Sequence, residues 1–113
     1  MTTTSTAPVS LYGFLTPKPA HADELRKLLM DLVEPSRGHE GSLQYHLHEQ
    51  EDGRFFLYEV WRSQEDLDRH NATPLLRAFM DELPQHLDGA PEAYFGTMRS
   101  SYPDGQRRAP KTA

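Results

Sequence analysis

The stretch from Phe55 to Pro74 limits the possible folds more than any other part of the chain. It begins with an apolar run up to Trp61 in which both alternating faces carry large side chains, a pattern typical of a central strand covered on both sides. Ser63 follows, with an acidic residue three positions later, and this spacing indicates the N-cap of a helix. Thr73 then predicts the start of a second helix, because the proline after it suits the first helical position. A strand that leads into two helices predicts a sheet with helices packed on it.

The other segments predict three further strands and one further helix. Strands are expected over residues 9–16, 41–50 and 91–98, where the side chains alternate between two faces. A helix is expected from about His21, because leucines recur after it at helical spacing, and Pro35 should end or kink this helix.

Two glycines and a second proline carry local signals. Asp52-Gly53 predicts a tight hairpin turn before the strand expected over residues 54–62. Gly13, inside the first strand, indicates that another group approaches the backbone closely. Pro84 should end or bend the last helix.

The expected order of elements, β-α-β-β-α-α-β, predicts an α+β fold of the ferredoxin-like type. In this βαββαβ arrangement two right-handed crossovers surround a hairpin, and helices cover one face of a four-stranded antiparallel sheet. The other face would then carry too much apolar surface for contact with water. Its expected members are Tyr12, Phe14, Phe56, Tyr58, Val60, Tyr94 and Met98. We therefore expect two copies of the chain to pack sheet to sheet as a homodimer with two-fold symmetry.

The length of 113 residues predicts one domain. We expect a mobile lead over residues 1–8, which is rich in Thr and Ser, and the domain itself over residues 9–98. Residues 99–113 are rich in Pro, Gly, Lys and Arg, and we expect a flexible tail there.

Composition excludes several classes of function. A formal net charge of −5 argues against a nucleic-acid partner, and the absence of cysteine excludes disulfides and thiolate metal sites. No apolar run approaches the roughly 20 residues that a membrane helix needs, so no membrane partner is expected. The first ten residues lack the basic and apolar regions of a secretory signal, and the expected location is the cytoplasm.

The six histidines give no evident metal site in the sequence. His46 and His48 share one strand face and would bind a metal only with a third ligand, but no carboxylate is placed to complete the set. An exposed or interfacial pair is the favoured interpretation. His21 and His39 are interpreted as helix-end or loop residues, and His86 has no evident partner. No metal ligand is therefore predicted.

The central segment EGSLQYHLHEQEDGRFFLYEVWRSQEDLDRHNATPLLRAF carries a specific combination of residues. The combination comprises Gly41 before the second strand, Tyr58, Glu59 and Trp61 at the end of the third, His70 on the next helix, and Thr73-Pro74 at the start of the last helix. With the elements in this order, it resembles the antibiotic biosynthesis monooxygenase (ABM) domain family. The similarity covers roughly residues 9–98.

The resemblance implies a dimeric α/β barrel with a pocket between the sheet and the helices of each subunit. Members of this family include quinol monooxygenases, and some oxidise quinols or anthrone-type polyketides with molecular oxygen and without metal or flavin. Others degrade haem. We therefore expect a cofactor-independent monooxygenase whose partners are molecular oxygen and a small quinol or polyketide-like aromatic.

A reaction of this kind needs a base and an aromatic wall in a dry pocket. His70 is expected to be the base, because an imidazole exchanges a proton near neutral pH, and Trp61 is expected to be the wall. The alternatives are a buried structural histidine and an ordinary core tryptophan.

Five further residues are substrate-binding candidates. Tyr12 or Tyr45 could hold a hydroxyl or carbonyl of the substrate. Glu59 could orient His70 or a substrate hydroxyl, although an ion pair with Arg62 or Arg77 is the favoured interpretation of this residue. The remaining candidates are Asn71 and Phe79, on the expected helices.

Two other functions are open. An isomerase or proton-transfer enzyme on a small carbonyl compound would use the same pocket, and an anion site of Arg62, Arg69 or Arg77 at its mouth would favour a phosphorylated substrate. A non-catalytic ligand-binding dimer would have an apolar pocket with His70 turned away or held by the backbone.

Overall fold

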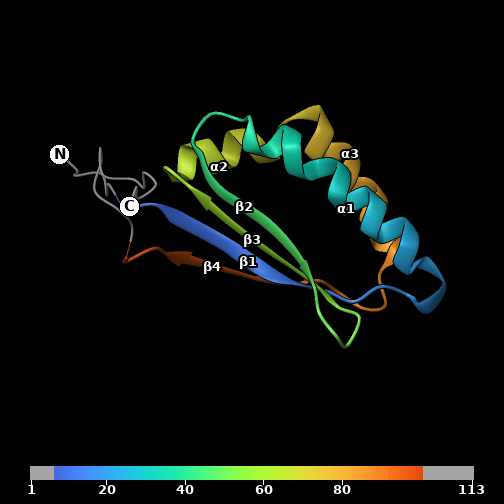
Figure 1. Ribbon diagram of the computed structural model, residues 1–113. Helices are drawn as coiled ribbons and strands as arrows, with labels where there is room; N and C mark the ends of the chain where they lie inside the picture. The colour runs from blue at the N-terminus through green and yellow to red at the C-terminus, as the bar shows by residue number, and fades with distance from the viewer. Residues whose placement is uncertain (1–6, 101–113) are drawn as a thin grey trace, which may run out of the picture.

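The computed structural model describes residues 7–100 of the chain. Four strands and three α-helices are joined by short connections, two of which contain 3-10 helices (Figure 1). In chain order the elements are β1 (Val9–Leu15), η1 (Pro19–His21), α1 (Ala22–Arg37), β2 (Ser42–Glu49), β3 (Phe55–Trp61), α2 (Gln64–Asn71), α3 (Pro74–Glu82), η2 (Leu83–His86) and β4 (Glu92–Thr97).

The strands form one antiparallel sheet in the order β2-β3-β1-β4, and the helices lie on one side of it (Figure 1). This arrangement confirms the ferredoxin-like α+β fold expected from the order of elements. Most of the expected lead and tail lies outside the described residues. In residues 7–100 no helix is long and apolar enough to span a membrane.

Side-chain caps begin the second and third α-helices as the sequence predicts. The Ser63 hydroxyl accepts a hydrogen bond from the Asp66 amide at 3.1 Å, and the Thr73 hydroxyl accepts one from the Leu76 amide at 3.3 Å. Each bond satisfies an amide that the first helical turn leaves without a partner.

Two prolines have different effects on their helices. Pro35 does not end α1, which continues to Arg37, because in the last turn a proline costs few backbone hydrogen bonds. The Gly38 amide then closes the helix with bonds to the Glu34 and Pro35 carbonyls. Pro84 lies just beyond the end of α3, in η2, as predicted.

The two glycine signals are also confirmed. Gly53 adopts a φ of +92° in the turn between β2 and β3. A side chain on Gly13 would overlap the carbonyl oxygen of Glu92 in β4, so the absence of a β-carbon lets the edge strand lie close to β1.

The hydrophobic core lies between the helices and one face of the sheet. Leu25, Leu29 and Leu32 on the inner side of α1 are almost completely buried, as are Phe55 and Trp61 on β3. These side chains supply the apolar contacts that hold the helix layer on the sheet.

The opposite face of the sheet is aromatic. The register places Tyr94, Tyr12 and Tyr58 in one row across β4, β1 and β3, with ring centroids 6.0 and 6.4 Å apart. Phe14 and Phe56 form the next row. No helix of the described chain covers this face, and Tyr94 is 50% exposed.

Gly41 lies where β2, β3 and α2 meet, and it adopts a φ of +83°. Its carbonyl accepts a hydrogen bond from the Arg62 amide at 2.8 Å, and a side chain here would overlap the carboxylate of Asp66. That carboxylate accepts bonds from Arg62, Arg69 and the Ser63 hydroxyl. The pKa of Asp66 is lowered to about 2, mainly by the hydrogen bonds from Arg62.

We predict that Gly41→Ala destabilises the fold much more than Gly53→Ala. Both positions have positive φ, which costs an alanine about 1–2 kcal/mol, but only Gly41 also faces the Asp66 carboxylate. The expected loss in free energy of unfolding is roughly 1 kcal/mol for Gly53→Ala and roughly 3 kcal/mol for Gly41→Ala. Urea titration of both variants measures the difference, and equal losses would show that Asp66 can move without cost.

Candidate functional site

A cavity of about 360 Å³ lies between the helix-covered face of the sheet and α3. Leu76, Phe79 and Met80 of α3 line one side, and residues of all four strands line the other. Phe95 and Met80, which are 68% and 55% exposed, border it toward the solvent. Its volume lies within the usual range of small-molecule sites.

The sheet register builds the floor of this cavity. Tyr45, Glu59, Leu11 and Phe95 are paired in one row across β2, β3, β1 and β4, and all four contribute to the cavity wall. Because side chains alternate along a strand, every member of a paired row points to the same face. One acidic residue and one tyrosine are thereby placed among apolar neighbours.

Glu59 is buried, with 3% of its surface exposed. Its one hydrogen bond in the described structure comes from the Trp61 indole nitrogen, at 2.9 Å. Burial raises the pKa of Glu59 to about 7, and the indole bond reduces this shift because it favours the carboxylate. The carboxyl can therefore exchange a proton near neutral pH.

His70 lies behind Glu59, against Trp61. The Trp61 and His70 rings are 4.4 Å apart between centroids, and His70 Nε2 is 3.8 Å from Glu59 Oε1. This nitrogen is buried and makes no hydrogen bond within the described residues. Burial, and then the positive charge that His39 can carry, lower the pKa of His70 to about 4. At neutral pH the ring is therefore uncharged.

His39 links this buried group to the surface. Its Nδ1 lies 2.8 Å from His70 Nδ1, and its side chain is only partly buried. One of the two nitrogens must donate a proton to the other, since a hydrogen bond needs one donor and one acceptor. Glu59, His70 and His39 thus form a line of titratable groups from the cavity floor to the edge of the protein.

Tyr45 completes the polar part of the floor. Its hydroxyl is buried without a hydrogen bond of standard geometry in the described structure. Burial and the Glu59 carboxylate raise the pKa of Tyr45 well above its ordinary value, so the hydroxyl keeps its proton. It can donate that proton in a hydrogen bond to a bound oxygen atom.

The structure separates the predicted site residues into three groups. Tyr45, Glu59, Asn71 and Phe79 line the cavity. Trp61 and His70 do not line it and lie behind Glu59, where both are almost completely buried. Tyr12 contributes to the wall, but its ring stacks on Tyr94 on the opposite face, because residue 12 alternates with the inward-facing Leu11. The Tyr12 ring therefore points away from the cavity, and a role for its hydroxyl in substrate binding stays a prediction.

The favoured interpretation of Glu59 as a partner of Arg62 or Arg77 is also wrong. Arg62 binds Asp66 and Glu40 at the surface, and Arg69 binds the same two carboxylates. Neither of these two arginines lines the cavity. No Arg or Lys is present among the described residues that line the cavity.

Sequence analysis missed the pairing of His39 with His70. The two residues are 31 positions apart, and neither the spacing nor the composition signals the contact. His46 and His48 lie on the aromatic face, with His46 between Gln44 and Arg37. In residues 7–100 one group of side chains has metal-ligand spacing, and it lies at the start of α1, away from Glu59.

Comparisons with known proteins agree on one family. The family model described as "Antibiotic biosynthesis monooxygenase" matches residues 8–82. An uncharacterized protein of Synechocystis is 34% identical over 82 residues, which are 71% of this chain and 56% of that protein. The chain therefore spans little more than half the length of this relative.

Two bacterial proteins of known structure are similar over most of their lengths. The Mycobacterium tuberculosis protein named "Putative monooxygenase Rv0793" is 36% identical over 70 residues, 61% of this chain and 69% of that protein. Its structure matches 79% of this chain and 92% of its own, with a TM-score of 0.76 at 28% identity. The structure of PA3566 from Pseudomonas aeruginosa matches 86% of this chain and 96% of its own, with a TM-score of 0.71 at 30% identity.

The opposite pKa shifts of Glu59 and His70 predict opposite effects of pH on stability. A carboxyl whose pKa rises from 4.5 to about 7 on folding makes the protein less stable as pH rises through this interval. A histidine whose pKa falls from 6.5 to about 4 makes it more stable as pH rises through that interval. Between about pH 4.5 and 6.5 the two effects oppose each other.

Single variants should reveal each effect. Relative to wild type, Glu59→Gln should gain free energy of unfolding as pH rises from about 4.5 to 7, and His70→Gln should lose it between about 4 and 6.5. Urea titrations at half-unit pH intervals measure both differences, and other groups cancel in the comparison. If the free energy of unfolding of both variants changes with pH as it does in wild type, the pKa shifts of Glu59 and His70 are contradicted.

Proposed function

This chain belongs to the antibiotic biosynthesis monooxygenase family, and we propose that it oxidises a small quinol or polyketide-like aromatic with molecular oxygen, without a bound cofactor. The observation that carries the proposal is one buried carboxyl, Glu59, in the floor of an otherwise mostly apolar cavity. Such a cavity suits a flat aromatic molecule, and a carboxyl with a pKa of about 7 suits proton exchange at neutral pH.

The proposed reaction begins when the substrate loses a phenolic or enolic proton to the protein. The resulting anion gives one electron to oxygen, and the substrate radical and superoxide combine to form a carbon–oxygen bond. Loss of water from this peroxide leaves a new carbonyl on the product. One oxygen atom enters the product and the other leaves as water, and the substrate supplies the electrons. The protein needs to supply only a base and a site from which water is excluded.

We assign the base to Glu59 instead of His70. Glu59 lines the cavity, whereas His70 lies behind it and its pKa is lowered to about 4, which makes the imidazole a weak base. Trp61 holds the Glu59 carboxylate through its indole N–H, and Tyr45 can donate a hydrogen bond to an oxygen of the substrate. Asn71 and Phe79 contribute a polar and an apolar part of the wall.

We further propose that His70 and His39 carry the proton from Glu59 to the solvent. His70 Nε2 is 3.8 Å from Glu59 Oε1, so a small side-chain movement would bring the two atoms into hydrogen-bond range. His70 Nδ1 already contacts His39, which is partly exposed. A base that is buried needs such a path to be ready for the next turnover.

The phosphorylated substrate of the isomerase hypothesis has less support. Arg62 and Arg69 are engaged with Asp66 and Glu40, and the described lining of the cavity contains no cationic side chain. A phosphate in this cavity would therefore lie next to Glu59 without a counter-charge.

Oxygen uptake by protein treated with EDTA, measured against a panel of quinols and anthrones, tests the proposal. We expect uptake above the spontaneous rate for at least one compound, with kcat/KM rising with pH to a plateau above about pH 7. Glu59→Gln should reduce the rate roughly 10²–10⁴-fold. Glu51→Gln, in the exposed hairpin loop, is the control and should behave as wild type.

Two outcomes would contradict this account. Uptake that persists in Glu59→Gln but is lost in His70→Gln, with a flat profile above about pH 5, would return the role of base to His70. Binding of the panel compounds without any oxygen uptake would favour the ligand-binding dimer.

We also propose that two copies pack through their aromatic sheet faces. The support is the row of Tyr12, Tyr58 and Tyr94, of which Tyr94 is half exposed, on a face that the described helices leave uncovered. Burying these rings between two sheets would remove a large apolar area from water.

Tyr58→Asp should dissociate or unfold such a dimer, because it would bury an unpaired charge in the centre of the interface. Met30→Asp is the matched control, since Met30 is 55% exposed on α1, in the layer opposite the aromatic face. Sedimentation velocity should show a dimer for wild type and Met30→Asp only. A Tyr58→Asp protein that sediments as wild type would show that the aromatic face is not the interface.

A further inference from the structure

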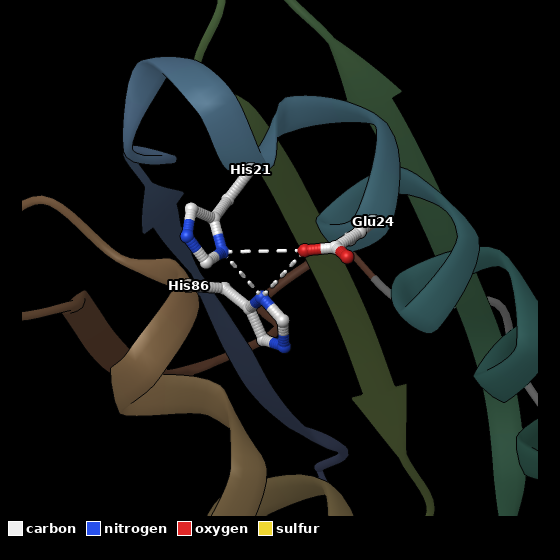
Figure 2. Close-up of side chains that lie close together, drawn as sticks. All are labelled: His21, Glu24 and His86. Atoms are coloured by element: carbon white, nitrogen blue, oxygen red, sulfur yellow. Dashed lines mark hydrogen bonds and ion pairs between the residues drawn. The ribbon is translucent and has the colours of Figure 1, made fainter.

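Two histidines from distant parts of the chain meet where η1 joins α1 and where η2 ends (Figure 2). His21 Nδ1 lies 3.0 Å from His86 Nδ1. Glu24 Oε1, one helical turn after His21, lies 3.3 Å from His21 Nδ1 and 3.7 Å from His86 Nδ1. Two imidazole nitrogens and one carboxylate oxygen therefore converge on one point.

The backbone fixes this meeting. The Lys18 amide donates to the His86 carbonyl at 2.9 Å, and the Asp88 amide donates to the Thr16 carbonyl at 2.7 Å. Pro17 and Leu87 form a bridge between the same two segments. The segment before α1 and the segment after η2 are thus paired like two short strands. This backbone pairing brings His21 and His86 close together independently of any contact between their imidazole rings.

We propose that His21, Glu24 and His86 bind one divalent transition-metal ion, with zinc as the best match. Zinc prefers nitrogen and oxygen ligands at about 2.0–2.1 Å in tetrahedral geometry, which places any two ligands about 3.3 Å apart. The three atoms form a triangle with sides of 3.0, 3.3 and 3.7 Å. Shifts of a few tenths of an ångström would give three corners of the tetrahedron, and water would take the fourth.

Glu82 orients one of the ligands. His86 Nε2 lies 3.1 Å from Glu82 Oε2, so this nitrogen donates its proton to the carboxylate and His86 Nδ1 presents a lone pair to the triangle. Histidines that bind metal commonly donate their second nitrogen to a carboxylate in this way. His86 is 6% exposed, whereas Glu24 has 67% of its side chain exposed, so the site opens to solvent on the Glu24 side.

Hydrogen bonding explains the close approach of these three side chains less well than a bound metal ion does. If His86 Nδ1 is an acceptor, His21 Nδ1 must donate to it, and the same proton must also serve the Glu24 carboxylate at 3.3 Å. A metal ion satisfies all three atoms at once. It would also tie the start of α1 to η2, and η2 supplies Leu83 to the cavity wall.

Titration of EDTA-treated protein, free of any affinity tag, with ZnCl₂ in a calorimeter tests the proposal. We expect one equivalent to bind and the thermal midpoint to rise with zinc concentration. His21→Ala should abolish this binding without loss of fold, because His21 is partly exposed. His86→Gln should also abolish it. Glu51→Gln, in the exposed hairpin loop, is the control and should bind as wild type.

A second measurement separates a built site from loose surface binding. Cobalt(II) should give the intense visible absorption of a tetrahedral site in wild type and Glu51→Gln, and not in His21→Ala. Glu82→Gln should weaken zinc binding about tenfold or more while the thermal midpoint of the metal-free protein stays unchanged, as expected for a positioning residue. Absence of binding near one equivalent, or binding that survives in both His21→Ala and His86→Gln, would overturn the proposal. Neither result depends on the reaction proposed above.

Discussion

The burial of one carboxyl group, that of Glu59, determines the chemistry that this fold can support. An ionised carboxylate among apolar side chains is costly, and the protein lowers the cost by letting the group hold a proton up to about pH 7 and by one hydrogen bond from Trp61. The neutral His70 ring behind it adds no charge to the same small volume. The cavity, the tryptophan and the histidine are therefore parts of one arrangement.

A comparison with Asp66 shows that hydrogen-bond partners determine the pKa of a buried carboxyl as much as burial does. The surfaces of both acids are almost completely covered, with 2% of Asp66 and 3% of Glu59 exposed. Asp66 is covered near the surface by Arg62 and Arg69, whose hydrogen bonds lower its pKa to about 2. Glu59 lies deeper and has one neutral donor, so burial dominates and its pKa rises. The same residue class thus serves as a structural anchor in one place and as a group that can exchange a proton in the other.

The fold could be predicted from the sequence because its signals are local. Ser63, Thr73 and the Asp52-Gly53 turn each act within a few residues, and strand alternation placed Tyr58 and Glu59 on opposite faces without knowledge of their neighbours. Pro35 does not end α1, since the cost of a proline in a helix depends on how close it lies to the helix end.

The candidate site was predictable only in part, because its geometry depends on contacts between distant segments. Tyr45, Asn71 and Phe79 lie on the cavity wall, but the depth at which His70 is buried depends on packing that the spacing of residues in the sequence does not reveal. The pairs His39–His70 and His21–His86 are separated by 31 and 65 positions. The pairing beside η2 brings His21 and His86 together, and both contacts become visible only in the folded chain.

The central claim is that Glu59 titrates near neutral pH, and a carbon-13 NMR titration of the side-chain carboxyls tests it most directly. One carboxyl resonance should change with a midpoint near pH 7, and this resonance should be missing from the spectrum of Glu59→Gln. If every glutamate carboxyl titrates near its ordinary pKa of about 4.3 in the folded protein, Glu59 is not held in an apolar environment and cannot act as the proposed base.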